Sequence, residues 1–280
     1  MNVLHAIVLG AVQGLTEFLP VSSSGHLIFF PKLFGWPDQG LAFDVVLHVG
    51  TLFAVVVYFR KKLIDILKSI FPKKSLITNH QSPVTNTEAR MNQMLALYIF
   101  LSTVPALIIG FFFSDWIETS LRSPVVIAYG LIGWGIMLGW ADIFARKQTS
   151  TQASRQSMNW KTAFFIGCAQ AIALIPGTSR SGITMTAGLF AGLSRSAAAE
   201  FSFLMSIPVI AIAGAVKTFE LFQNGLGDIG VLPLVAGFLT SFVFGFSAIW
   251  GLMKIIQKWS FLPFVLYRVA VGILILVLFL

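Results

Sequence analysis

Charged residues are scarce in this chain of 280 residues. They make up 11% of the sequence, whereas hydrophobic residues make up 56% and the mean hydropathy is +0.85. A soluble domain carries about 25% charged residues because its surface must face water, so this composition excludes a water-soluble globule. Tyrosine is scarce too, with four residues against 27 phenylalanines, as expected of a surface that faces lipid. The composition predicts an integral membrane protein.

Cysteine is almost absent, and basic residues do not collect in one solvated segment. The single Cys168 excludes an intramolecular disulfide and any metal cluster with several cysteine ligands. The net charge is +8, but Lys and Arg lie in short segments between apolar runs, so we expect no nucleic-acid partner. A cleavable signal peptide is not expected either, because the first apolar stretch contains Gln13 and Glu17 and lacks a basic segment before it.

Several apolar runs are long enough to cross a bilayer, which takes about 20 residues. Two further apolar regions, near 3–35 and 160–193, are each interrupted by a cluster of Pro, Gly and hydroxyl residues. Each half is too short for a crossing, so we expect two re-entrant pairs of short helices that meet near the midplane, with full spans kinked at proline as the alternative. The predicted fold is an all-α polytopic membrane protein, one membrane domain over 1–280. Its six expected crossings lie near 40–59, 92–113, 123–143, 199–218, 229–252 and 261–280.

Most Lys and Arg residues fall on one side of these expected crossings, mainly in the segments 60–91 and 144–162. The positive-inside rule assigns that side to the cytoplasm. We therefore expect a cytoplasmic loop over about 60–91 and both termini outside. The first re-entrant pair then enters the membrane from outside, and the second enters from the cytoplasm.

The two interrupted regions are also similar in sequence. Residues 10–13 align with 167–170 through Gly and Gln at the same positions, and residues 20–23 align with 176–179 through Pro and Ser. Each repeat would hold one re-entrant pair and three crossings, and because three is odd the second copy must be inverted. Inverted repeats with broken helices are a transporter architecture, in which the substrate binds where the breaks meet. The repeats would cover about 1–143 and 157–280.

Glu17 is an acid in an apolar stretch, one helical turn before the first break. An ionised carboxylate there is costly unless it is paired, metal-bound or hydrated, so it is a functional candidate by default. Gln13 is four residues earlier and shares its helix face. The alternative is that Glu17 only fixes packing through hydrogen bonds to hydroxyl groups.

Ser22, Ser23, Ser24 and His26 follow the first break. A serine and a histidine within reach of each other can act as nucleophile and base, or the histidine can itself attack or protonate phosphate. Serines after proline are also typical of helix N-caps, which is the alternative for each of them. His48 lies in an expected crossing, where we expect a packed histidine whose hydrogen bonds are satisfied.

Arg180 opens the short helix after the second break. A guanidinium at this depth needs an anionic partner, and the helix N-terminus adds exposed N–H groups, so the residues indicate an oxyanion site suited to phosphate. The alternative is an arginine that pairs structurally with Glu17 or extends to the membrane surface. Nearby hydroxyl donors are Thr178, Ser179, Ser181 and Thr184.

Together, these groups fit a phosphate ester or a diphosphate with a hydrocarbon tail, because Phe, Leu and Ile would form the walls of a site within the membrane. One carboxylate cannot build a protein-only metal cage at this depth. Mg²⁺ or Ca²⁺ can still be held by Glu17, the carbonyl of Gln13, water and substrate oxygens.

Residues 13–26 and 176–184 resemble the two signatures of the undecaprenyl-diphosphatase family, membrane enzymes linked to bacitracin resistance, and residues 47–51 and 200–204 are similar too. The resemblance implies hydrolysis of undecaprenyl diphosphate to the monophosphate lipid carrier of peptidoglycan synthesis, with a divalent cation. It also implies a bacterial inner-membrane protein whose site opens to the periplasm. By motif position it implies catalytic roles for Glu17, Ser23, His26 and Arg180; phosphate binding by Ser22, Ser24, Thr178, Ser179, Arg180, Ser181 and Thr184; and metal binding by Glu17 and Gln13.

Three points are open. Gln13 stands where the family often has Glu, which removes one negative charge and makes Gln13 a weaker candidate for a metal ligand than Glu17. A flippase or transporter of polyprenyl phosphates on the same scaffold is the competing function, since fold alone does not separate it from an enzyme. We also leave open whether the chain forms a homo-oligomer.

Overall fold

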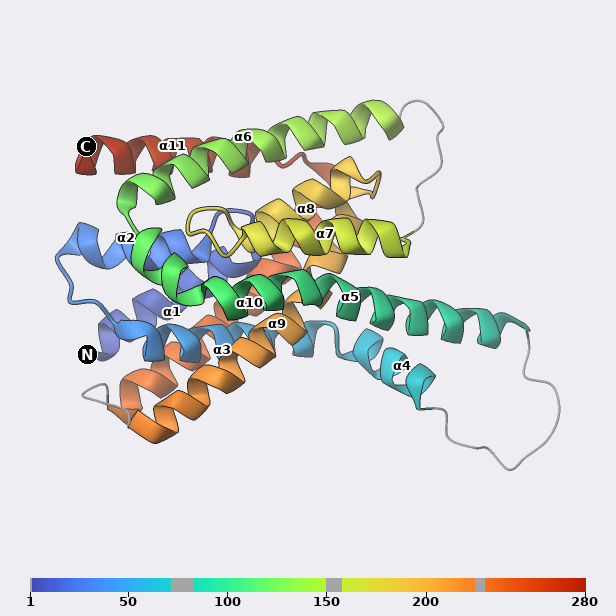
Figure 1. Cartoon of the computed structure of the whole chain (residues 1–280), viewed down its shortest axis with the longest axis horizontal. Helices are drawn as coiled ribbons and strands as arrows, with labels where there is room; N and C mark the ends of the chain where they lie inside the picture. Colours follow the sequence, from blue (N-terminus) through green and yellow to red (C-terminus); the bar gives the residue numbers. More distant parts are fainter. Residues whose placement is uncertain (1, 72–82, 150–157, 225–229) are drawn as a thin grey trace.

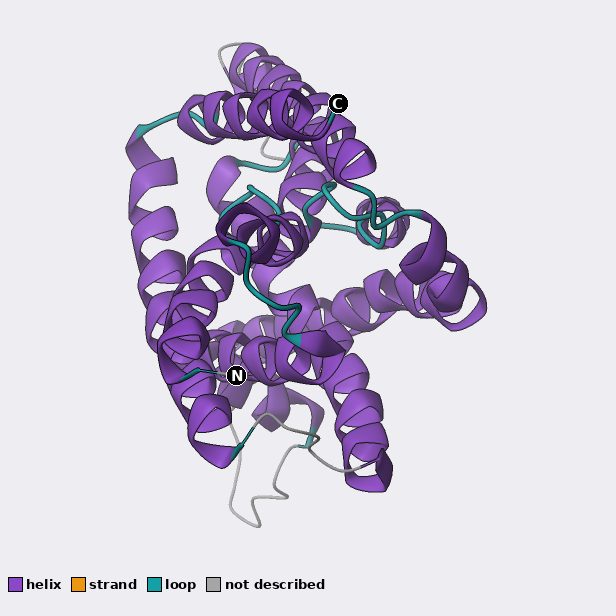
Figure 2. Ribbon diagram, turned by 90° about the vertical axis from the view of Figure 1, so that its left-hand side faces the viewer, coloured by secondary structure: helices purple, strands orange, loops and turns teal. Residues whose placement is uncertain are grey.

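The structure is a computed structural model that describes residues 2–71, 83–149, 158–224 and 230–280. In these ranges the chain forms helices and no strands (Figures 1 and 2). The helices are α1 Val3–Phe18, α2 Ser23–Phe34, α3 Gly40–Tyr58, α4 Arg60–Ile70, α5 Pro83–Ser120, α6 Pro124–Thr149, α7 Trp160–Ile172, α8 Arg180–Phe190, α9 Arg195–Asn224, α10 Val231–Lys258 and α11 Leu262–Phe279.

All six expected crossings are helices. By length and apolar composition α5, α6, α9, α10 and α11 can each cross a membrane, and α3 adds a sixth when it is counted with α4, which bends away by 75°. The prediction of an all-α polytopic membrane protein is confirmed.

The expected loop over 60–91 is not all loop. It contains α4 and the beginning of α5, while residues 72–82 lie outside the described part of the chain. The sequence of α4 explains this, because its apolar residues recur at helical spacing between the basic ones, which favours an amphipathic helix.

Both interrupted regions are broken helices. Residues 19–22 separate α1 from α2, and residues 173–179 separate α7 from α8. The four helices have 16, 12, 13 and 11 residues, and at about 1.5 Å per residue none reaches the roughly 30 Å of a bilayer core. The kinked-span alternative does not describe either region, because each contains two helices joined by non-helical residues.

Small residues let the first half of each broken pair approach a long helix closely. A Cβ atom added to Gly10 of α1 would lie 2.7 Å from the Gly237 carbonyl oxygen of α10, and one added to Gly167 of α7 would lie 2.6 Å from the Ser102 carbonyl oxygen of α5. Such contacts are typical of packing between membrane helices. Gly10 and Gly167 are equivalent in the sequence alignment of the repeats, so both copies use the same packing device.

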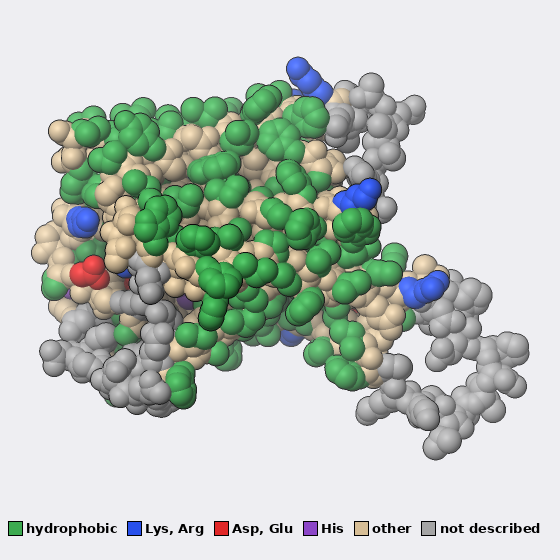
Figure 3. Space-filling model, viewed as in Figure 1, with side chains coloured by type: hydrophobic (Ala, Val, Ile, Leu, Met, Phe, Trp, Pro, Cys, Tyr) green, Lys and Arg blue, Asp and Glu red, His purple; other side chains and the backbone are tan. Residues whose placement is uncertain are grey.

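The ends of the molecule differ in charge. The start of α1 and the end of α11 lie at one end, and most of the Lys and Arg that Figure 3 shows lie at the other, beyond a flank covered by hydrophobic side chains (Figures 1 and 3). Large apolar side chains are exposed on the crossing helices, among them Phe111 and Phe112 of α5, which are 81% and 70% exposed. The arrangement fits the expected topology, although the repeat boundaries and the membrane orientation stay predictions.

Candidate active site

The two breaks border a cavity of about 400 Å³. Its wall is formed by α1, α2, α3, α5, α8 and α9, the second break and the α5–α6 connection. Most of the lining is apolar, from side chains such as Leu27, Ile117 and Ile210. The polar residues that line it are Glu17, Ser23, Ser24, Asp44, His48, Ser114, Arg122, Ser179 and Arg180.

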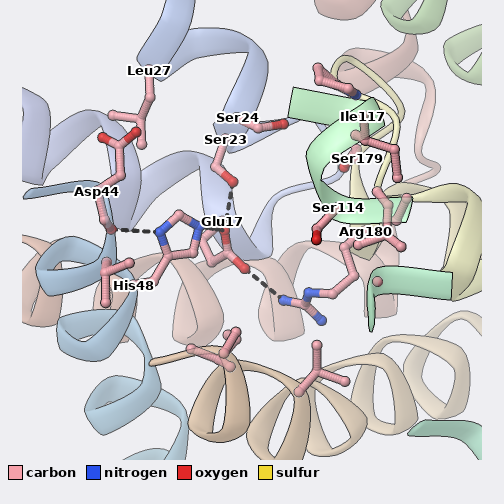
Figure 4. A pocket seen from close by; sticks show the side chains of 18 of the residues that line it. Glu17, Ser23, Ser24, Leu27, Asp44, His48, Ser114, Ile117, Ser179 and Arg180 are labelled. Atoms are coloured by element: carbon pink, nitrogen blue, oxygen red, sulfur yellow. Dashed lines mark hydrogen bonds and ion pairs between the residues drawn. The ribbon is translucent and has the colours of Figure 1, made fainter. Parts of the chain in front are cut away.

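Glu17 is the polar centre of this cavity (Figure 4). Its Oε1 accepts a hydrogen bond from Arg180 Nη2 at 2.9 Å, and its Oε2 accepts bonds from Ser23 Oγ at 2.5 Å and Gln13 Nε2 at 3.1 Å. The Glu17 side chain is only 6% exposed, so these partners offset the cost of burying a carboxylate. The structure therefore brings together Glu17, Ser23 and Arg180, as expected if the two breaks meet.

Arg180 forms the ion pair with Glu17 that the sequence left as an alternative, and it also lines the cavity. Its Nη1 donates to the Ser202 carbonyl oxygen of α9 at 3.1 Å. These bonds use two of the five N–H groups of a guanidinium. Because the side chain is 13% exposed toward the cavity, further donors can reach an anionic ligand.

The residues just before α2 and α8 have the same unusual backbone. Ser22 and Ser179 have φ of 75° and 71°, and they are the non-glycine residues with positive φ in the described chain. Their Oγ atoms accept hydrogen bonds from the Gly25 and Gly182 N–H groups at 3.4 and 3.1 Å. This conformation costs on the order of 1–3 kcal/mol and is found mainly where function requires it.

Ser22 caps the N-terminus of α2 and Ser179 caps the N-terminus of α8, and both helices start at the cavity wall. The first N–H groups of a helix have no partner within the helix and carry partial positive charge, so they attract anions. Ser23 and Ser24 at the start of α2, and Arg180 at the start of α8, all line the cavity. Two half-helix N-termini therefore face the same space as the guanidinium.

Only some of the hydroxyl residues expected to bind phosphate line the cavity. Ser24 and Ser179 do so. Ser181 Oγ instead donates to the Leu19 carbonyl oxygen at 3.0 Å, which joins the second broken pair to the first. The expected phosphate-binding residues that are buried behind the cavity wall are Ser22, Thr178, Ser181 and Thr184.

His48 faces the cavity. Its Nε2 lies 3.7 Å from Glu17 Oε2 (Figure 4), and its Nδ1 donates to the Asp44 carbonyl oxygen at 2.7 Å. The prediction that His48 is a packed, satisfied histidine is wrong, because its side chain is 32% exposed and Nε2 points at a carboxylate.

His26 lies away from this group. It is 2% exposed, its Nδ1 lies 2.7 Å from the Ser22 carbonyl oxygen, and its Nε2 lies 2.7 Å from the Tyr267 hydroxyl of α11. It does not line the cavity, so the structure does not place it beside Glu17 or Ser23. A direct part for His26 in the reaction stays a prediction.

A pair of variants separates the two histidines. We expect His48→Ala to lower kcat by about 10²-fold, the usual lower size of an acid–base contribution. His26→Ala removes the contact between α2 and α11; a purely structural part predicts a fall in kcat of about 5-fold, the worth of roughly one hydrogen bond, whereas a direct part in the reaction predicts about 10²-fold or more. Steady-state kinetics of both proteins measure the ratio. A larger loss in His26→Ala than in His48→Ala, with head-group binding intact, would restore His26 to the reaction.

Glu17 offers the cavity one carboxylate for a hard divalent cation, while Gln13, the second expected ligand, is 0% exposed and does not line the cavity. Gln13 Oε1 is buried and has no hydrogen-bond partner among the described residues, and Glu17 supplies a carboxylate on the next helical turn. No cluster of three His, Cys, Asp or Glu suited to a metal is found in the described residues. Mg²⁺ or Ca²⁺ would therefore need phosphate and water oxygens to complete its ligands.

Comparison with known proteins places the chain in a family. The family model described as bacitracin resistance protein BacA matches residues 6–274. The chain belongs to the BacA family.

Curated BacA-family relatives match over nearly their full length. Undecaprenyl-diphosphatase 2 of Stutzerimonas stutzeri (strain A1501) is 46% identical over 281 residues, which cover 100% of this chain and 99% of the relative. Undecaprenyl-diphosphatase 1 of Pseudoalteromonas translucida (strain TAC 125) is 46% identical, with 98% and 97% covered. Undecaprenyl-diphosphatase of Geobacter metallireducens is 44% identical, with 97% and 96% covered.

Four polar residues that line the cavity of this BacA-family chain were not among the predicted site residues: Asp44, His48, Ser114 and Arg122. Asp44 and His48 carried a usable signal. They are four residues apart in an apolar helix, so they share one face, and polar residues on one face of a membrane helix indicate a cavity. Arg122 follows α5 in a connection, where sequence alone does not say which way it points.

Proposed function

We propose that this protein hydrolyses undecaprenyl diphosphate to undecaprenyl phosphate and inorganic phosphate. The products would recycle the lipid carrier of peptidoglycan synthesis and confer resistance to bacitracin. The relatives named undecaprenyl-diphosphatase support the substrate. The observation that carries the proposal is the contact of Ser23 and Arg180 with the same buried carboxylate, Glu17, in a cavity bordered by two helix N-termini.

The substrate fits both parts of the cavity. The terminal phosphate binds at the starts of α2 and α8, where Arg180 offers a planar fork of donors that matches phosphate oxygens. The apolar walls, with Leu27, Ile117 and Ile210 among them, accept the first isoprene units. The rest of the tail extends into lipid, which needs no enclosed tunnel.

The reaction begins with attack of Ser23 Oγ on the terminal phosphorus. Glu17 accepts the Ser23 proton, since Ser23 Oγ already donates to it at 2.5 Å. The bond from the terminal phosphorus to the bridging oxygen breaks, and undecaprenyl phosphate leaves with that oxygen. Water then attacks the phosphoserine and gives a proton to His48, which lines the cavity. The bond from phosphorus to Ser23 Oγ breaks, Glu17 returns its proton to that oxygen, and phosphate leaves. Arg180 stabilises the charge on the phosphoryl oxygens in both steps.

A divalent cation is part of the proposal. Glu17 and the amide oxygen of Gln13 would hold it together with phosphate oxygens, and when bound it would offset the negative charge of the diphosphate. The protein residues perform the proton transfer and the binding of the phosphate regardless of which cation is preferred.

Glu17→Gln tests this part. We expect kcat to fall by about 10²-fold because the base is lost, and we expect the dependence of the residual rate on Mg²⁺ or Ca²⁺ to weaken. Titrating the cation against both proteins measures the second effect. If the cation titration of Glu17→Gln had the same midpoint and amplitude as that of the wild type, Glu17 would not be a metal ligand.

We also propose that the protein lies in the inner membrane of a bacterium with its site open to the periplasm. Replacing Cys168 with Ser leaves a chain without cysteine, into which single reporters can be placed. In intact spheroplasts an impermeant thiol reagent should label Asp38→Cys, between α2 and α3, and should not label Lys61→Cys in α4 until the membrane is opened. Labelling of Lys61→Cys without labelling of Asp38→Cys would show that the membrane orientation is the reverse of the one proposed.

Phosphate release by the purified protein in detergent tests the proposed function. With undecaprenyl diphosphate and Mg²⁺ or Ca²⁺ we expect stoichiometric release of phosphate and of undecaprenyl phosphate. Lipid that is bound but not cleaved would instead favour the flippase.

A further inference from the structure

Arg268 of α11 is fully buried, with 0% of its surface exposed. Its guanidinium donates to carbonyl oxygens in both breaks: to Pro20 at 3.2 Å in the first, and to Gly177 and Thr178 at 3.1 and 2.9 Å in the second. Two further bonds, each 3.1 Å long, reach α6, at Gly130 and Leu131. One side chain therefore ties both breaks to the helices behind them.

Among the residues that the structure describes, Arg268 has no acidic partner, and carbonyl dipoles alone offset its burial. A buried charge of this kind is expensive and a hydrophobic residue of similar size would cost less. An apolar side chain could not make the five hydrogen bonds that Arg268 makes here.

We propose that Arg268 is a positioning residue that holds Ser23 in register with Arg180. Pro20 lies three residues before Ser23, and Thr178 lies two residues before Arg180. Because these carbonyls bond to one rigid guanidinium, the distance between the two breaks is fixed. The distance between the N-termini of α2 and α8, which follow the breaks, is then fixed as well. The inference rests on the proposed function, because it concerns the alignment of the attacking hydroxyl with a phosphate held by Arg180.

Only a guanidinium can make this link. It presents five N–H donors in a plane, whereas the lysine ammonium has three donors on a flexible stem and cannot reach the same set of carbonyls. Without the link each break keeps its own cap, so phosphate still binds, but Ser23 loses its alignment with the phosphorus. Misplacement by about 1 Å costs on the order of 10²-fold in rate.

The neighbouring residue supports the same role for α11. Tyr267 is bonded to His26 at 2.7 Å, and His26 lies in the first turn of α2. The consecutive residues Tyr267 and Arg268 of α11 thus contact α2, which carries Ser23, and both breaks.

The first test is Arg268→Lys in the purified full-length protein. We expect kcat to fall by about 10²-fold while KM changes by less than about 3-fold, because alignment is lost and binding is kept. Arg195→Lys is the matched control. Arg195 is also largely buried and bonds to Asp142 at 2.5 Å, but it does not touch either break, so any loss of stability in Arg195→Lys should leave kcat per folded molecule within about 3-fold.

A second pair of variants disturbs Arg268 without changing it. A Cβ atom on Gly135 of α6 would lie 3.1 Å from Arg268 Cβ and 3.3 Å from its Nε, whereas one on Gly133 of the same helix meets nothing within 4 Å. Both changes from Gly to Ala raise helix propensity equally. We expect Gly135→Ala to lower kcat by about 5- to 10-fold with unchanged KM, and Gly133→Ala to match the wild type. If Arg268→Lys does not fold, the comparison of Gly135→Ala with Gly133→Ala tests the positioning role of Arg268 on its own.

The outcomes separate the inference from the proposed function. Phosphate release by the wild type upholds the function whatever the variants do. A fall in kcat for Arg268→Lys and Gly135→Ala, without one in the controls, supports the inference. Equal kcat in Gly135→Ala and Gly133→Ala, or a loss in Arg268→Lys that appears mainly in KM, overturns it.

Discussion

Arg180→Ala is expected to lower kcat/KM for undecaprenyl diphosphate by about 10³-fold or more, and Arg180→Lys by about 10²-fold. The guanidinium bridges Glu17 and the Ser202 carbonyl oxygen at 2.9 and 3.1 Å while it faces the cavity. Lysine keeps the charge but cannot hold both contacts and also make the two-pronged bond to phosphate. Phosphate release at saturating and limiting substrate measures both parameters.

Arg195→Lys makes the same exchange of side chains outside the cavity, at the start of α9, where Arg195 pairs with Asp142. It should retain kcat/KM within a few-fold, which is usual for a change far from the reacting atoms. Near-normal turnover in Arg180→Lys would remove the guanidinium from the reaction and leave it as a structural partner of Glu17.

Ser23→Ala is expected to lower kcat by about 10³-fold or more, because the covalent route is lost and only slow direct attack by water remains. Substrate binding should survive, since Arg180 and the helix N-termini are retained. Binding of the substrate to Ser23→Ala, measured in detergent without turnover, provides the comparison.

Ser24→Ala is the matched control for that change. Ser24 is the next residue of α2 and also lines the cavity, but its hydroxyl lies near Ser22 Oγ at 3.5 Å and makes no contact with Glu17. Loss of one neutral hydrogen bond should cost about 5-fold. Equal small losses in the two variants would mean that water attacks the phosphorus directly.

The fold could be predicted because the hydrophobic pattern is strong and unmixed. Runs of about 20 apolar residues allow little besides a crossing helix, and the Pro, Gly and Ser clusters marked both breaks. The contact between Glu17 and Arg180 was only one of the alternatives for Arg180, and it rested on the requirement that charges in a membrane need partners. The distance in sequence between them did not matter for that argument.

The positions of the histidine side chains could not be predicted in the same way. Proximity in sequence to Ser23 favoured His26, but the rotation of α2 about its axis turns His26 toward Tyr267 of α11. His48 reaches Glu17 from α3. Which face of a helix looks into a cavity depends on how the helices pack, and one sequence does not contain that information directly.

Arg268 shows a different limit. It is an isolated charge in an apolar crossing, so the sequence contained a signal. Its partners are backbone carbonyls, which every residue possesses, so no spacing of side chains could identify them. The helix α4 was missed as well, because its many basic residues were taken to indicate a loop.

The most direct test of the central claim is to identify the residue that carries the phosphoryl group during turnover. Undecaprenyl diphosphate labelled with ³²P in the terminal phosphate is mixed with the purified protein, quenched within the first turnover in dodecyl sulfate at neutral pH, which preserves both phosphoserine and phosphohistidine, and digested to peptides. The account predicts label on Ser23 in the wild type and none in Ser23→Ala. Label on a histidine, or normal turnover by Ser23→Ala, would contradict it.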